Sequence, residues 1–150
     1  TIVLLHGHGD CKENQIPIAR AMVRRGYRVF IPDLPAHGDS EGEYVTFGLV
    51  EGEVVSGLID SLLPLSGQQE VIITWGHSLG GATAIHAAAR NGRVDAVVSA
   101  STFSSLRAVV PDYFREFLPF YPLLISEEGI DAAITRAGRV AGPLTFHVKR

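Results

Sequence analysis

The stretch Gly76-His77-Ser78-Leu79-Gly80 lies between an apolar run and a helix-forming segment, and it decides the fold. The run before it, residues 71–75, is short, β-branched and unalternating, as expected of a central parallel strand buried on both faces. The segment after it, residues 81–90, is rich in alanine and indicates a helix. A strand that turns at once into a helix strains the turning residue and leaves room only for small neighbours. The pattern therefore predicts a sharp turn with Ser78 at its tip and glycine required two positions to either side.

Two segments nearer the start of the chain extend this pattern. Thr1-Ile2-Val3-Leu4-Leu5 predicts a strand and is followed by His6-Gly7-His8-Gly9. Residues 27–31 predict the next strand, and Pro32-Asp33-Leu34-Pro35-Ala36-His37-Gly38-Asp39-Ser40 follows it. With the G-x-S-x-G stretch, these segments resemble the H-G-x-G loop and the D-x-x-G-H-G-x-S turn of the α/β-hydrolase superfamily. Ala36 stands where that family usually has glycine, a departure that touches loop packing more than chemistry.

Strands and helices alternate along the chain, which predicts an α/β fold with a doubly wound, mostly parallel sheet. Helices are expected over residues 12–25 and from Thr46, which can cap the second one. We expect that second helix to bury a single apolar stripe, and residues 94–100 to form another buried strand. The stripe consists of Val50, Val54, Leu58 and Leu62.

The resemblance also sets expectations for the ends of the chain. The family normally has two strands before the one that begins near Thr1, so we expect a partial core over residues 1–150, truncated at both ends. Residues 130–139 predict a helix, and residues 142–148 look like the beginning of the family's seventh strand. Aromatic residues gather between Phe103 and Tyr121. They suggest a lid or cap at about 102–128, or simply an insert packed onto the sheet.

The resemblance implies a serine hydrolase of the lipase, esterase or serine-aminopeptidase-like type. Ser78 would be the nucleophile, and the main-chain N–H groups of Leu79 and His8 would bind the oxyanion. Gly7, Gly9, Gly76 and Gly80 would serve the backbone geometry of the turn and loop. The expected reaction cleaves an ester, thioester or amide of a small-molecule acyl substrate and requires no cofactor.

A serine nucleophile needs a base, and no histidine takes that position convincingly. His86 lies eight residues along the predicted helix, roughly 12 Å up its axis. The earlier histidines belong to loop motifs, where we expect them to organise the loops by hydrogen bonding. His147 is expected inside a strand, and no carboxylate after Ser78 occupies a convincing acid position. The resemblance therefore implies an acid and a histidine beyond the C-terminus, and an inactive or nearly inactive fragment.

Two other hypotheses come from different classes of protein. His6-Gly7-His8-Gly9-Asp10 also fits the start of a zinc site in which His6, His8 and Asp10 would be ligands, although Cys11 stands where that motif continues with histidine. Alternatively, the chain is a non-catalytic α/β-hydrolase scaffold that acts as a binding module. Intact nucleophile and oxyanion motifs argue against binding alone.

Composition bounds the remaining expectations. The net charge is −3 with no basic cluster, which argues against a nucleic-acid partner. The single cysteine, Cys11, excludes an internal disulfide, is compatible with the cytoplasm, and places our expectation there. No signal-peptide pattern and no long apolar span are visible in these residues, so we expect no transmembrane segment among them. It does not predict the oligomeric state.

Overall fold

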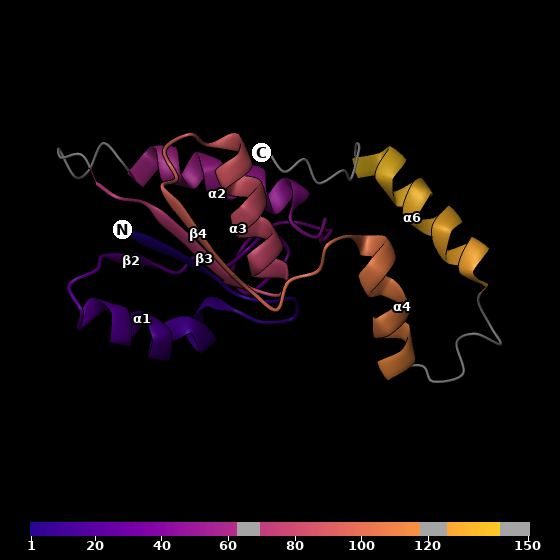
Figure 1. Cartoon of the computed structure of the whole chain (residues 1–150), viewed down its shortest axis with the longest axis horizontal. Coiled ribbons are helices and arrows are strands. Elements are labelled where there is room, and N and C mark those ends of the chain that lie inside the picture. Colours follow the sequence, from indigo (N-terminus) through magenta and orange to yellow (C-terminus); the bar gives the residue numbers. More distant parts are fainter. Residues whose placement is uncertain (63–69, 118–125, 142–150) are drawn as a thin grey trace. The chain divides into compact units, whose positions relative to one another are not determined.

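The computed structural model describes residues 1–62, 70–117 and 126–141 (Figure 1). They divide into two compact units, the first covering residues 1–102 and the second beginning at Phe103. The expectations for residues 142–148, including His147, lie outside the described residues. So does part of the expected lid, residues 118–125.

The first unit is built on a four-stranded sheet in the order β2-β1-β3-β4, in which every pairing is parallel. The strands are β1 (Ile2–Leu5), β2 (Val29–Phe30), β3 (Ile73–His77) and β4 (Ala96–Ala100). In the register of the sheet, Leu5 lies opposite Gly76, which in turn lies opposite Ser99. The predicted parallel sheet and the central place of the strand before Ser78 are confirmed.

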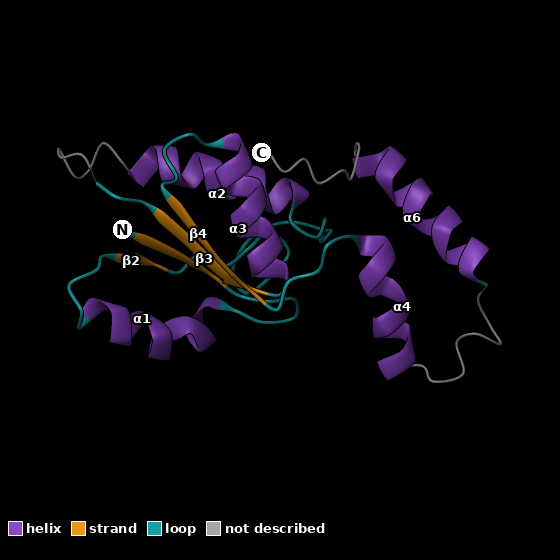
Figure 2. Ribbon diagram, in the orientation of Figure 1, coloured by secondary structure: helices purple, strands orange, loops and turns teal. Residues whose placement is uncertain are grey.

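Helices cover both faces of this sheet (Figure 2). The short 3₁₀ helix η1 (Lys12–Gln15) leads into α1 (Ile16–Val23) on one face, and α2 (Leu49–Leu62) and α3 (Leu79–Arg90) lie on the other. Successive residues of β1 point to opposite faces, so Val3 and Leu5 join the core below α2 and α3, whereas Ile2 and Leu4 join the core below α1. An unbroken apolar run in β1 follows from this double burial.

The prediction that residues 94–100 form a buried strand is wrong in its burial. A strand does form there, as β4, but all its residues are exposed. The reason is its position: β4 pairs with β3 along one edge and with no strand of the described chain along the other. Apolar β-branched sequence alone does not distinguish an edge strand from a central one.

The expected apolar stripe of α2 is wrong in its first half, although Leu58 does pack against the core and Leu62 is half-buried. Val50 and Val54 are exposed, whereas Val55 and Ile59 are buried in the core one position further along the helix. Glu51 begins that buried face and is itself fully buried. The buried stripe was overlooked because it begins with a glutamate, Glu51. The neighbouring stripe contains only apolar residues and therefore matched the expected helical periodicity better.

The second unit contains α4 (Leu106–Phe117) and α6 (Glu127–Ala141), which contact each other. The helix expected over residues 130–139 lies within α6. An ion pair joins Arg107 of α4 to Asp131 of α6. The interpretation of residues 102–128 as a lid stays a prediction.

Candidate active site

Ser78 is the single residue between β3 and α3. Its backbone has φ +52° and ψ −117°, a conformation that a non-glycine residue adopts only when its surroundings impose it. Hydrogen bonds hold the turn on the side of β4: the Ser78 N–H donates to the Ala100 carbonyl at 2.9 Å, and the Thr102 hydroxyl donates to the Ser78 carbonyl at 2.9 Å. The strain predicted for this turn is therefore present and locally supported.

The two glycines that flank Ser78 leave no space for a side chain. A Cβ at Gly76 would lie 2.0 Å from the carbonyl oxygen of Gly80. A Cβ at Gly80 would lie 2.3 Å from the carbonyl oxygen of Leu5, in the neighbouring strand. The first turn of α3 is thus packed directly on the end of β1.

The loop after β1 lies beside the serine. A Cβ placed on Gly7 would be 3.7 Å from Cβ of Ser78 and 3.5 Å from Nδ1 of His77. Gly9, in the same loop, has a φ of +69°. Because β2 and β3 lie on opposite sides of β1, the loops after β1 and β3 leave the sheet in different directions. Such a switch point, at the carboxyl ends of parallel strands, is where open α/β sheets bind ligands.

Two of the loop histidines organise the loops at this edge. His6 is fully buried, and its Nε2 accepts a hydrogen bond from the Leu34 N–H at 2.9 Å. An acceptor at Nε2 assigns the proton to Nδ1, which lies 2.8 Å from the Gly7 carbonyl and donates to it. Nδ1 of His37 lies 2.9 Å from the carbonyl oxygen of Pro35. His6 thereby ties the loop after β1 to the loop after β2.

The hydrogen bonds of His6 and Asp10 argue against the zinc hypothesis. Both ring nitrogens of His6 are engaged with main-chain groups, and the Asp10 carboxylate is engaged with the Cys11 N–H and the Asn14 and Gln15 side chains. Across the described part of the chain, no three His, Cys, Asp or Glu side chains are grouped so that they could hold a metal ion. The H-x-H-x-D spacing here serves loop structure.

Through its carboxylate, Asp33 connects the segments that follow β1 and β2. Its side chain is 3% exposed and accepts hydrogen bonds from the Lys12 N–H at 2.7 Å, from Lys12 Nζ and from the Asp39 N–H at 3.0 Å. Burial opposes ionisation of Asp33, but these donors outweigh it and lower its pKa to about 2. The same carboxylate, followed by that of Asp39, raises the pKa of Lys12.

Replacing Asp33 by asparagine is expected to lower the free energy of unfolding at pH 7 by about 1–2 kcal/mol, a value reduced for the partial exposure of Lys12. The folded-state pKa lies below its ordinary value of 3.8, so the ionised carboxylate stabilises the fold above about pH 4. That contribution is lost as the pH falls toward 2. Urea unfolding of wild type and Asp33→Asn at pH 7 and pH 3 measures it, and the difference should narrow at pH 3.

Asp39→Asn is the matched control, because Asp39 also contacts Lys12 Nζ, at 2.7 Å, but has a side chain that is 91% exposed. We expect its effect to stay below about 0.5 kcal/mol. Equal effects for the two variants, or a difference independent of pH, would contradict the role given to Asp33.

The remaining candidates for a base or acid lie elsewhere in the first unit. His86 is buried on α3, where Arg90 Nη1 lies 3.1 Å from its Nδ1; burial first, and Arg90 second, lower its pKa. Asp95 accepts a hydrogen bond from the Ile72 N–H at 2.8 Å, at the amino end of the sheet. Both are therefore structural in position, as expected for His86.

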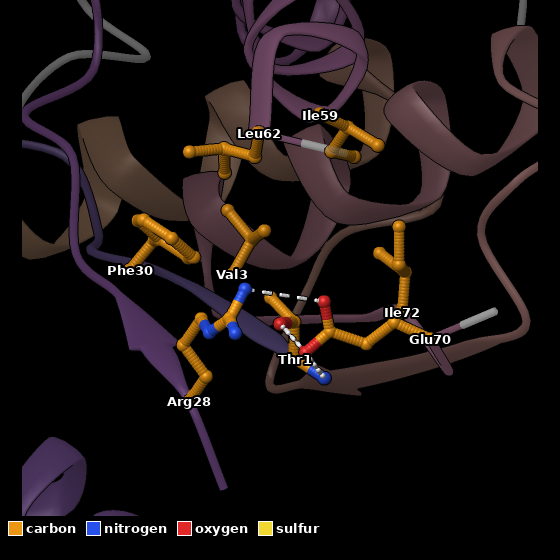
Figure 3. A pocket seen from close by; sticks show the side chains of 8 residues that line it. All are labelled: Thr1, Val3, Arg28, Phe30, Ile59, Leu62, Glu70 and Ile72. Atoms are coloured by element: carbon orange, nitrogen blue, oxygen red, sulfur yellow. Dashed lines mark hydrogen bonds and ion pairs between the residues drawn. The ribbon is translucent and has the colours of Figure 1, made fainter. Parts of the chain in front are cut away.

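The hollow in Figure 3 also lies away from Ser78. Its lining includes Thr1 and Ile72, which precede β1 and β3, so it lies at the amino ends of the strands. Arg28 and Glu70 form an ion pair across it at 3.4 Å. We assign it no part in the candidate site.

Sequence reasoning missed three of the groups that organise this site: Glu51, the Lys12–Asp33 pair and the Thr102 hydroxyl. The Glu51 carboxylate accepts hydrogen bonds around Thr46, near the start of α2, so a carboxylate placed soon after a Thr cap was the available signal. The Lys12–Asp33 pair joins residues 21 positions apart, and no local pattern marks it.

Comparison with known proteins agrees with the fold. A family model described as the alpha/beta hydrolase fold matches residues 1–129, and the chain belongs to that family. It is similar to a pyrethroid hydrolase of Sphingobium wenxiniae, with 34% identity over 85 residues, covering 55% of this chain and 28% of that protein. It is also similar to protein bem46 of Schizosaccharomyces pombe, with 27% identity over 119 residues, covering 76% of this chain and 38% of that protein.

Solved structures show the same arrangement. An esterase of Pyrococcus furiosus superposes with a TM-score of 0.64 at 23% identity, covering 79% of this chain and 52% of that one. A monoacylglycerol lipase of Paleococcus ferrophilus superposes with a TM-score of 0.54 at 27% identity, covering 79% of this chain and 47% of that one. The chain thus spans about half or less of each of these proteins. Within the described residues, none of the helices combines the length and apolar character needed to cross a bilayer.

Proposed function

We propose that the protein is a serine hydrolase that cleaves an ester, thioester or amide through an acyl-enzyme on Ser78. The observation that carries the proposal is the position of Ser78: alone between β3 and α3, at φ +52°, on the carboxyl edge of the sheet. A hydroxyl held there is exposed to a substrate at the switch point, beside the first N–H groups of a helix.

The oxyanion would be bound by the main-chain N–H groups of Leu79 and His8. Leu79 opens α3 directly after the serine, and the loop that carries His8 lies against Ser78 through Gly7. The Leu79 N–H lies in backbone fixed by the close packing of Gly80 on β1, and fixed donors are what electrostatic stabilisation of a developing charge requires. We assign the general base and the acid to none of the described residues.

A small apolar acyl substrate is the class that we favour. The Sphingobium relative is named a pyrethroid hydrolase and the Paleococcus neighbour a monoacylglycerol lipase, and these names support a carboxylic ester over a peptide. Family membership alone does not decide between ester and peptide substrates, because one fold hosts many activities.

Fluorophosphonate labelling of the full-length natural protein tests the proposal, since the probe reacts with activated serines and not with ordinary ones. We expect the label on the peptide that contains Ser78, and its loss in Ser78→Ala and after heat denaturation. A folded protein that takes no label would overturn the proposal and favour a non-catalytic scaffold. Labelling at a different serine would overturn the assignment of Ser78.

A further inference from the structure

A row of aromatic rings connects the loops around Ser78. The ring of His6 lies 5.1 Å from that of His37, which lies 5.5 Å from that of His8, and both contacts are edge-to-face. The His8 ring also lies 5.9 Å from the ring of Phe47, in the loop before α2. His8 is therefore held between side chains from two other loops, although it is itself exposed.

Phe47 has a strained backbone. Its φ is +55°, a value that costs a bulky residue of the order of 1–3 kcal/mol and persists only where the surroundings fix it. The half-buried Phe47 side chain packs against the core that contains Leu79, the residue after Ser78. In this conformation Phe47 packs against that core and its ring also contacts the ring of His8.

The buried carboxylate of Glu51 fixes this conformation from both sides of Phe47. It accepts hydrogen bonds from the Thr46 N–H at 2.7 Å, the Thr46 hydroxyl at 2.5 Å and the Gly48 N–H at 2.9 Å. Gly48 fits closely against α3, because a Cβ there would be 3.0 Å from Cδ2 of His86 and 3.1 Å from the carbonyl carbon of Ala82. The loop is anchored both to α2 and to the helix that follows Ser78.

We propose that Glu51 and Phe47 are positioning residues for the oxyanion loop. Glu51 holds Phe47 in its strained conformation, and the Phe47 ring, opposite that of His37, holds His8 so that its main-chain N–H keeps its orientation beside Ser78. The expected effect on catalysis rests on the proposed function, whereas the expected effect on the order of the His8 loop does not. The hydrogen bonds to Glu51 from Thr46 and Gly48 all come from one loop, which explains why a polar side chain is tolerated on the buried face of α2, where an apolar residue would otherwise pack.

The test uses Phe47→Ala, with Phe47→Tyr as the conservative variant, in the full-length natural protein. We expect Phe47→Ala to lower kcat about 10-fold, a fraction of the loss from removing one oxyanion donor, with KM changed less than about 2-fold. The loss should be equal for p-nitrophenyl acetate, butyrate and octanoate. Hydrogen exchange over residues 6–10 should become faster in Phe47→Ala. Phe47→Tyr keeps an aromatic ring, so both its kcat and its exchange over residues 6–10 should stay close to wild type. Glu51→Gln should act in the same direction as Phe47→Ala.

Leu58→Ala is the matched control, because Leu58 packs against the same core from α2. It should lower the melting temperature and leave kcat and the exchange of residues 6–10 unchanged. A kcat for Phe47→Ala equal to that of Leu58→Ala would overturn the proposal, as would a loss that grows with acyl chain length, which would make Phe47 a wall of the acyl pocket. If Ser78→Ala kept full activity, the proposed function would fail, and exchange over residues 6–10 would still decide whether Phe47 holds the loop.

Discussion

Replacing Ser78 by alanine in the full-length natural protein is expected to lower kcat for ester hydrolysis by about 10⁵- to 10⁶-fold. In the proposed mechanism no acyl-enzyme forms without the hydroxyl, and only the proposed oxyanion donors and substrate binding would remain to accelerate attack by water. KM should change little, since the serine contributes mainly to the transition state. Steady-state hydrolysis of a p-nitrophenyl ester measures the loss directly.

Ser61→Ala is the control for the chemical change, because Ser61 is an exposed serine on α2 whose hydroxyl donates to the Gly57 carbonyl at 2.9 Å. It should keep wild-type kcat. Ser78→Gly separates chemistry from strain: it should be as inactive as Ser78→Ala and yet more stable by about 1 kcal/mol, since glycine adopts a φ of +52° freely. Activity retained in Ser78→Ala would remove the serine mechanism altogether.

Local constraints made the turn at Ser78 predictable from sequence. Gly76 and Gly80 stand where a Cβ would meet backbone atoms, so their spacing records a steric requirement. The flanking runs then needed only their composition to indicate a strand and a helix. The parallel order of the sheet followed from the alternation of strands and helices.

Burial was harder to predict, because it depends on partners distant in sequence. Residues 96–100 are as apolar as a central strand, but their position at an edge exposes them. In α2, the face with Val55 and Ile59 was overlooked because Glu51 begins it. The hydrogen bonds that make that burial tolerable come from the loop at Thr46 and Gly48, whose conformation no periodicity describes.

The loop chemistry illustrates the same limit. The sequence of residues 6–10 matched the oxyanion loop of the family and also the start of a zinc site, although Cys11 stands where the zinc motif continues with histidine. The structure argues against the zinc site, because the N–H of Leu34, 28 residues after His6, donates to Nε2 of His6. A ring nitrogen that accepts a main-chain N–H is not available to a metal ion.

Replacing Gly80 by alanine is expected to destabilise the fold by about 3 kcal/mol or more, a large share of the stability of an ordinary domain. The added Cβ would lie 2.3 Å from the Leu5 carbonyl oxygen and 2.5 Å from that of His6. These are backbone atoms, and β1 is fully buried on both faces, so the clash can be relieved only by moving α3 away from the sheet. That movement would shift the N–H of Leu79 and the loop after β1 together, so activity should fall with stability.

Gly57→Ala is the matched control, since a Cβ at Gly57, also in a helix, would meet nothing within 4 Å. There the change should stabilise by about 0.5–1 kcal/mol, because alanine loses less backbone entropy than glycine in a helix. If close packing at Gly80 holds the turn at Ser78 against β1, urea unfolding should show a lower free energy of unfolding for Gly80→Ala and a higher one for Gly57→Ala. A Gly80→Ala protein as stable and as active as wild type would mean that the turn can move without consequence, and the geometry assigned to Ser78 would lose its physical basis.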